Sequence, residues 1–348
     1  MMNFDYVRPA SVADAIAAAS EKGATYLASG TNLLDLMKGG VSRPSRLVDV
    51  TRLPGLDRVE RFPDGGVRIG TLVRNADLAH DAEFARNYPA VAEALLSGAS
   101  AQLRNAATVG GNLMQRTRCA YFYDAGSACN RRWPGAGCDA VKGENRLHAV
   151  LGWSEGCIAT HPSDFCVPLV AFDAVVEIEG KGGRRELPLD ALHRLPGDAP
   201  ERETTLERGD LIVALRLPAE AQGFARHARY IKVRERTSYA FAVVSAAAGL
   251  RIEDGKIREA RLALGGVAAK PWRAREAEQL LAGAAPDVAV YREAARAALA
   301  DAKPSGDNAF KIELAQRIIV RALTLAAAGT PDRIPALPGS PFSSVAGA

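Results

Sequence analysis

All five cysteines of this 348-residue chain fall within one short stretch, which makes that stretch the first candidate for chemistry. They are Cys119, Cys129, Cys138, Cys157 and Cys166. An odd number of clustered cysteines in a chain of this length argues against a disulfide framework and favours a metal or redox site in a reducing compartment. The first four follow the spacing C-x9-C-x8-C-x18-C, which lacks the C-x2-C pairs of zinc ribbons and bacterial ferredoxins.

Four thiolates are the usual ligands of a 4Fe–4S cluster, and their wide spacing suits a loop wrapped around such a cluster. Arginines of the same segment could offset the negative charge of the cluster, namely Arg118, Arg131 and Arg132. Cys166 lies in the apolar run "DFCVPLVAF" and is interpreted as a core residue. Two alternatives stay open: four thiolates on zinc, or a mixed set that uses His148 or His161, which are otherwise structural histidines.

Two glycine-containing turns could bind an anion. The sequence "YLASGTNLLDL" places Gly30 between a predicted strand and a predicted helix, where unpaired backbone N–H groups point outward. The sequence "NAATVGGNL" contains Gly110 and Gly111, which would let the backbone approach a ligand closely. Either could be a plain turn, but two such turns with Thr and Asn beside the glycine suggest one dinucleotide held between subdomains. The chain contains neither G-x-G-x-x-G nor a Walker A motif.

The helices and strands that must position these residues can be predicted from the spacing of apolar residues and from the residues that begin or end an element. The first 50 residues predict strand, helix, strand, helix, strand, with Ser11 as the cap of the first helix. A strand "GVRIGTLV" and helices from about residue 75 to 107 come next, whereas 114–160 lacks periodicity and is expected to be an insertion. Further expected elements are the strand "RGDLIVALRLP", the strand "RYIKVRER", a hairpin around "EDGK", and two or three helices within 272–328.

Composition excludes several classes of protein. The net charge is only +4, without a long basic run for nucleic acid. No window approaches eighteen uninterrupted apolar residues, so no membrane span is expected. The start "MMNFDYVRPAS" lacks the pattern of a signal peptide. We therefore expect a cytoplasmic protein, unless a signal-bearing partner subunit exports the folded complex to the periplasm.

Several stretches together resemble the FAD-binding subunits of molybdenum hydroxylases, the xanthine dehydrogenase family. They are "LASGTNLLDLM", "QLRNAATVGGNL", "SDF", "KVRERTSYAFAVVSAAAGL" and "ARLALGGVAAKPWRAREAE", which match in order and spacing to about Ala328. The resemblance implies an α/β (α+β) fold: a two-subdomain FAD-binding domain of the vanillyl-alcohol-oxidase/PCMH type and a C-terminal α/β domain of the CO dehydrogenase flavoprotein type. The implied domains are 1–222 (subdomains about 1–58 and 59–222, with the cysteine-rich insertion about 114–160), 223–329, and an extended tail 330–348.

The same resemblance implies residues that bind FAD. The segment that wraps the pyrophosphate would be Tyr26, Leu27, Ala28, Ser29, Gly30, Thr31, Asn32, Leu33 and Leu34, with Ser29 where relatives often have glycine. Residues along the pyrophosphate, ribityl and flavin would be Thr108, Gly110, Gly111 and Asn112. Asp164 would accept hydrogen bonds from the cofactor beside Ser163, Ile212 would contact it, and Lys232 would approach the flavin. The plain alternatives are that Asp164 only caps the helix starting at Phe165 and that Lys232 is a solvated strand residue. No side chain is assigned a catalytic role.

Many members of this family pass almost directly from "GGN" to "SD", whereas residues 113–163 intervene here. The inserted segment resembles the cluster-bearing insertion of bacterial aldehyde oxidoreductase flavin subunits, most closely in "CNRRWPGAGC" and "NRLHAVLG", and less closely that of 4-hydroxybenzoyl-CoA reductase. The resemblance implies one 4Fe–4S cluster on Cys119, Cys129, Cys138 and Cys157.

The function implied is electron transfer within a heterotrimer or its dimer. A large molybdenum-cofactor subunit would oxidise an aldehyde to a carboxylic acid, and a small 2Fe–2S subunit would pass the electrons through FAD to an external acceptor. Two alternatives stay open: the beta subunit of a 4-hydroxybenzoyl-CoA reductase-like complex, and a metal-stabilised scaffold without flavin redox activity.

Overall fold

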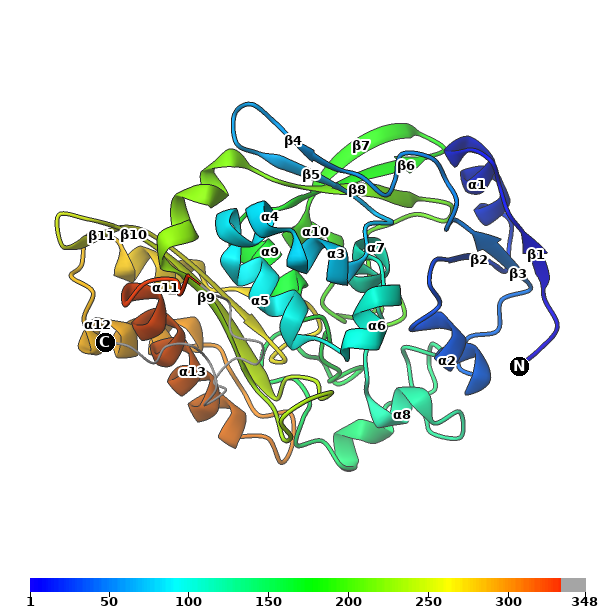
Figure 1. The fold of residues 1–348 in the computed structure, drawn as a ribbon. Helices are drawn as coiled ribbons and strands as arrows, with labels where there is room; N and C mark the ends of the chain where they lie inside the picture. The colour runs from blue at the N-terminus through cyan, green and yellow to red at the C-terminus, as the bar shows by residue number, and fades with distance from the viewer. Residues whose placement is uncertain (333–348) are drawn as a thin grey trace.

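The computed structural model describes residues 1–332, in which three β-sheets are joined by short helices (Figure 1). The predicted tail therefore lies almost wholly outside the described residues. The first sheet has the order β1-β3-β2 and is parallel, as expected when strands are connected through helices. Its elements are β1 (Asp5–Val7), α1 (Val12–Ala19), β2 (Ala24–Leu27), α2 (Leu33–Lys38) and β3 (Arg46–Asp49). As predicted, the Ser11 hydroxyl caps α1 by accepting a hydrogen bond from the Asp14 N–H.

The second sheet is antiparallel and has the order β4-β5-β8-β6-β7. Its strands are β4 (Val59–Arg61), β5 (Val67–Gly70), β6 (Val175–Gly180), β7 (Gly183–Pro188) and β8 (Leu211–Leu217). The helices of this part are α3 (Asn75–His80), α4 (Ala82–Asn87), α5 (Pro89–Ser97), α6 (Ala101–Ala106), α7 (Val109–Leu113), α9 (Cys166–Ala171) and α10 (Leu189–Leu192). A large apolar core lies between the sheet and helices α3, α5 and α9. The charged edge strand β7 was not predicted, because its sequence "GRRELP" has no apolar face to recognise.

The cysteine-rich segment forms few regular elements, as its lack of periodicity predicts. It contains α8 (Ala120–Tyr123) and the 3-10 helix η1 (Asp139–Lys142). Phe122 and Cys129 pack on Leu36 of α2, so the insertion lies against the first subdomain (Figure 1). The order of this segment must therefore come largely from turns and from contacts such as those with α2.

The third sheet is antiparallel, has the order β12-β11-β10-β9, and is covered by long helices. Its elements are η2 (Ala219–His227), β9 (Ala228–Val233), β10 (Val244–Glu253), β11 (Lys256–Gly265), β12 (Trp272–Arg273), α11 (Arg275–Leu281), α12 (Val288–Ala298) and α13 (Phe310–Ala327). Asp254 and Gly255 connect β10 to β11 with positive φ angles, which confirms the predicted hairpin. The helices and sheet bury a second large apolar core.

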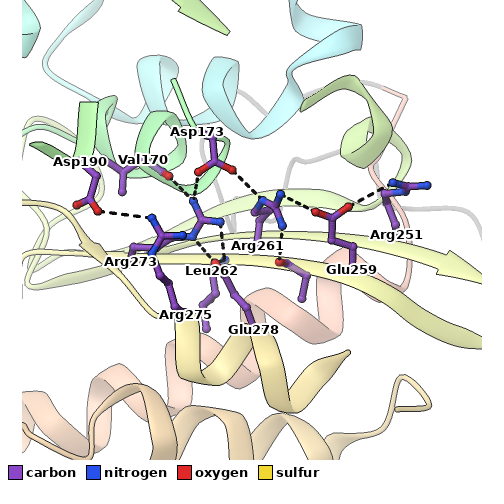
Figure 2. Close-up of polar contacts among 11 residues, drawn as sticks. Val170, Asp173, Asp190, Arg251, Glu259, Arg261, Leu262, Arg273, Arg275 and Glu278 are labelled. Carbon is purple, nitrogen blue, oxygen red and sulfur yellow. Dashed lines mark hydrogen bonds and ion pairs between the residues drawn. The ribbon is translucent and has the colours of Figure 1, made fainter. Parts of the chain in front are cut away.

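A cluster of ion pairs joins this third sheet to the end of α9 (Figure 2). Arg273 on β12 donates to the carbonyl of Val170 at 2.6 Å and to the carboxylate of Asp173 at 3.0 Å. The same guanidinium pairs with Glu278 of α11. Its side chain is only 4% exposed, so it belongs to the interior of the contact between the two parts. The domain boundaries given above stay a prediction.

Candidate functional site

The first glycine turn presents a row of unpaired backbone donors. Gly30 has φ +78°, a conformation that favours glycine. In residues 1–332, the N–H groups of 29–33 have no backbone hydrogen-bond acceptor. Asn32 stands immediately before α2, where asparagine commonly caps a helix, yet its side chain makes no such bond. The donors of this turn are therefore available to an anion such as a pyrophosphate.

The second glycine pair lies within α7 rather than in an open turn, which corrects the sequence prediction. The Thr108 hydroxyl caps this short helix by accepting from the Gly111 N–H at 3.2 Å. The Gly110 N–H donates to the Thr71 carbonyl at 2.9 Å, and a Cβ at Gly110 would come within 1.7 Å of the Thr71 hydroxyl. Packing against Thr71 thus explains Gly110. Only Gly111, which is exposed, offers an open backbone face to a ligand.

Thr71 also brings β8 close to the second glycine pair. Its N–H donates to the carbonyl of Val213 at 3.0 Å, next to Ile212. Ile212 itself is 4% exposed and lies in the large apolar core. Its contact with a cofactor stays a prediction.

Asp164 and Lys232 form a buried ion pair. The Lys232 ammonium donates to Asp164 Oδ2 at 2.7 Å, and its side chain is 2% exposed. Tyr230 donates its hydroxyl to Asp164 Oδ1 at 2.6 Å, and burial together with the Asp164 charge raises the pKa of this tyrosine. The interpretation of Lys232 as a solvated strand residue is therefore wrong.

Ser163 connects this ion pair to α7. Its hydroxyl donates to Asn112 Oδ1 at 2.7 Å and accepts from the Cys166 N–H at 3.2 Å. Ser163, and not Asp164, therefore receives the first N–H of α9, so the capping interpretation of Asp164 is also wrong. Ser163 and Asp164 line a small cavity together with Arg118, His161 and Phe241. Hydrogen bonds thus connect Asn112, Ser163 and, through Asp164, Lys232, which the sequence analysis took from three separate stretches.

The four cysteines assigned to a cluster line one small cavity. In residues 1–332, no three of their sulfur atoms lie within 4.8 Å of one another. Four thiolates on a single zinc ion at a Zn–S distance of about 2.3 Å would place their sulfurs about 3.8 Å apart. The four sulfur atoms as placed are therefore too far apart to share one zinc ion. Cys166 lies outside it, fully buried in the apolar core, as predicted.

The histidines do not complete a mixed ligand set in this cavity. His148 Nε2 lies 3.2 Å from Cys119 Sγ, which is a hydrogen-bond contact, and burial lowers the pKa of this histidine. His161 lies instead beside His193, with their Nε2 atoms 3.2 Å apart. These two histidines and Cys166 form a separate buried group.

The polar environment of the cavity suits bound thiolates. Backbone N–H groups of α8 face the sulfur of Cys119, and those of 140, 141 and 158 face Cys138. Burial raises the pKa of the Cys119 thiol to about 11 and also raises the pKa of Cys138. Burial thus favours the neutral thiol form of both cysteines. Hydrogen bonds to sulfur are one means by which proteins adjust iron–sulfur clusters.

Only one of the three arginines proposed to offset cluster charge touches a cysteine. Arg131, with a side chain 5% exposed, donates to Cys157 Sγ at 3.6 Å and pairs with Glu203 at 2.7 Å. Arg118 stacks on Phe241, and Arg132 binds backbone carbonyls of α8 and Ser127.

Comparisons with known proteins identify the family to which this chain belongs. The family described as the FAD binding domain in molybdopterin dehydrogenase matches residues 2–220, and the CO dehydrogenase flavoprotein C-terminal domain matches residues 229–326. The chain is 48% identical over 330 residues, 94% of its length, to the aldehyde oxidoreductase FAD-binding subunit PaoB of Escherichia coli K12, covering 99% of that protein. The chain belongs to the FAD-binding subunits of the molybdenum hydroxylases.

Other members of this family also match nearly the whole chain, at lower sequence identity. The carbon monoxide dehydrogenase medium chain of Hydrogenophaga pseudoflava is 28% identical, over 93% of this chain and 96% of that protein. A solved structure of that enzyme, in a form lacking the Mo-pyranopterin moiety, matches with a TM-score of 0.73 over 94% of this chain and 98% of that chain, at 28% identity. The fold class predicted from the sequence is confirmed. Among residues 1–332, no helix combines the length and apolar composition needed to cross a membrane.

Sequence reasoning about this FAD-binding subunit missed several residues that support its sites. Thr71 fills the space beside Gly110, Tyr230 binds Asp164, and Glu203 holds Arg131. Each belongs to a different element from the residue it supports. No local signal in the sequence could have identified them, since their partners are distant along the chain.

Proposed function

We propose that this chain is the FAD- and 4Fe–4S-containing electron-transfer subunit of a molybdenum aldehyde oxidoreductase, which oxidises aldehydes to carboxylic acids. The observation that carries the proposal is the 48% identity to PaoB across nearly the whole of both chains. The cavity lined by all four proposed ligand cysteines supports the cluster independently.

The residues proposed for FAD have separate roles. The free N–H groups from Ser29 to Leu33 would bind the pyrophosphate. Gly111 and Asn112 would lie along the cofactor between that turn and the Asp164–Lys232 pair, with Lys232 nearest the flavin. FAD held there would supply the chemistry for electron transfer from the partner side to an external acceptor. The protein's part is to position the cofactor and to supply fixed charges around it.

The proposed cluster ligands are Cys119, Cys129, Cys138 and Cys157. Arg131 would partly balance the charge of four thiolates from a buried position. A bound cluster would supply a second redox centre and the folding free energy that an irregular segment lacks.

The proposed partners are a large molybdenum-cofactor subunit and a small 2Fe–2S subunit, forming a heterotrimer or its dimer. The known relatives are themselves subunits or medium chains of larger enzymes, which supports assembly with other chains. Substrate oxidation would take place on the large partner, so no side chain of this chain is assigned a catalytic role.

The first experiment is anaerobic purification of the full chain with its partner subunits, followed by quantification of flavin, iron and zinc. We expect one FAD per complex and about four iron atoms beyond those of the 2Fe–2S partner, the content of one cubane cluster. Cys138→Ser should lose these four iron atoms and keep those of the partner, and Cys166→Ala is the matched control that should retain all of them. Zinc in place of iron would refute the cluster, and absence of flavin from the folded wild-type protein would refute the main proposal. Reduction of the bound flavin by aldehydes, and not by purines, would support the substrate class.

A further inference from the structure

The cysteine-rich segment holds the side chain of Asn32 from both ends. The backbone N–H of Arg116 donates to Asn32 Oδ1 at 3.0 Å, and Asn32 Nδ2 donates to the hydroxyl of Tyr123 at 3.3 Å. Arg116 and Tyr123 lie on either side of Cys119 in the sequence. The hydrogen-bonding atoms of Asn32 are thus engaged by the segment proposed to bind the cluster.

This engagement has a direct consequence for the first glycine turn. An asparagine at this position would normally accept a hydrogen bond from an N–H of its own helix. Here Asn32 makes no capping bond, because its side-chain oxygen accepts from Arg116. A cap would engage the N–H of Leu34 or Asp35, so the N–H groups of 29–33 stay free in either case, and the contact instead ties the turn to the cysteine-rich segment.

Packing and ion pairs fix the groups that hold Asn32. Phe122, which is 1% exposed, packs on Leu36 of α2, and the Arg116 guanidinium stacks on its ring at 4.5 Å. The same guanidinium pairs with Glu203, which also binds Arg131 beside Cys157. A continuous series of contacts therefore leads from the cysteine cavity to Asn32.

We propose that Tyr123 and Arg116 are positioning residues for FAD: they hold the Asn32 side chain from both ends and so fix the turn at 29–33, and the cluster-binding segment thereby sets the affinity of the pyrophosphate turn. The inference rests on the proposed function, since it requires that this turn binds FAD. Loss of the cluster should loosen α8, which begins directly after Cys119, and should thereby weaken FAD binding.

The test is the dissociation constant of FAD for the full chain in its complex, measured by flavin fluorescence after release of the bound flavin. Tyr123→Phe removes one hydroxyl and should raise this constant about three- to tenfold, the effect of one hydrogen bond. The matched control is Tyr121→Phe, since the Tyr121 hydroxyl in the same helix accepts from the Glu144 N–H instead. The control should leave the constant unchanged, and both variants should keep the wild-type iron content.

A double-mutant cycle shows whether Tyr123 acts through Asn32. In an Asn32→Ala background, Tyr123→Phe should have no further effect on FAD binding. ADP carries a pyrophosphate but no flavin, and its affinity can be measured by competition with FAD. Tyr123→Phe should lower the affinity for ADP by the same factor as the affinity for FAD. Cys138→Ser should weaken FAD binding as well.

The outcomes separate this inference from the proposed function. A wild-type chain that binds no FAD would refute the proposed function. A chain that binds FAD with the same dissociation constant in wild type and Tyr123→Phe would overturn the inference alone. An effect of Tyr123→Phe that persists undiminished in the Asn32→Ala background would also overturn it.

Discussion

Arg273 should be one of the most important side chains for stability, because it is buried at the contact between the third sheet and the rest of the chain (Figure 2). We predict that Arg273→Met lowers the free energy of unfolding by about 3–5 kcal/mol, the usual cost of removing one partner from a buried ion pair. The cost comes mainly from Glu278, which would keep a buried carboxylate with only the Leu262 N–H as a close donor. Asp173 is 47% exposed and contributes little to it.

The predicted loss depends on pH in a defined direction. Burial raises the pKa of Glu278 against the opposing effect of Arg273, and without that arginine the pKa should rise further. A carboxyl group whose pKa is higher in the folded than in the unfolded state loses stability as the pH rises above the unfolded value of about 4.3. The penalty of Arg273→Met should therefore be larger at pH 8 than at pH 5.

Urea denaturation followed by circular dichroism measures this effect. Arg273→Met/Glu278→Gln should recover part of the lost stability, since the uncompensated charge is gone. Arg275→Met is the matched control: its side chain is 58% exposed and lies 3.7 Å from Asp190, so the loss should stay below about 0.5 kcal/mol. An Arg273→Met variant that loses less than about 1 kcal/mol at pH 8 would refute the reasoning.

Three further predictions concern other parts of the molecule. Gly110→Ala should cost about 1–3 kcal/mol by overpacking, because the new Cβ comes within 1.7 Å of the Thr71 hydroxyl. Thermal denaturation should show a smaller loss for Gly111→Ala, whose Cβ meets the Thr108 hydroxyl at 3.1 Å. Lys311 is fully buried, and burial lowers its pKa to about 7. Between pH 7 and about 10.4 the Lys311 side chain binds a proton in the unfolded chain but not in the folded one. The free energy of unfolding of the wild type should therefore rise with pH across this window relative to that of Lys311→Met. An equal pH dependence of the two proteins would contradict this. Removal of the metal by an iron chelator should increase protease cleavage within 113–163 before cleavage elsewhere, as mass spectrometry of early fragments can test.

The structure suggests why an electron-transfer subunit could carry a cysteine-rich insertion at this place. The segment follows α7 directly and returns to the chain just before Ser163, so both of its ends border the proposed FAD site. Its own side chains reach the first glycine turn through Asn32. The two proposed cofactor sites therefore share one structural support.

The sequence by itself determined the features that depend on neighbouring residues. The segment "LLDLMK" forms α2 as predicted, and the "EDGK" hairpin forms between β10 and β11. The apolar run around Cys166 correctly separated this cysteine from the other four, because the residues of that run are adjacent in the sequence. Local patterns of this kind fix backbone conformation and burial within a few residues.

The tertiary structure alone decided which polar groups meet. Lys232 pairs with Asp164, which lies 68 positions away in the sequence. Arg131 pairs with Glu203, which lies 72 positions away. Gly110 was misread as part of an open turn because its neighbour in space, Thr71, belongs to another part of the chain. Desolvation, hydrogen bonding and close packing act between atoms that the fold brings together, and these contacts have no signature in local sequence.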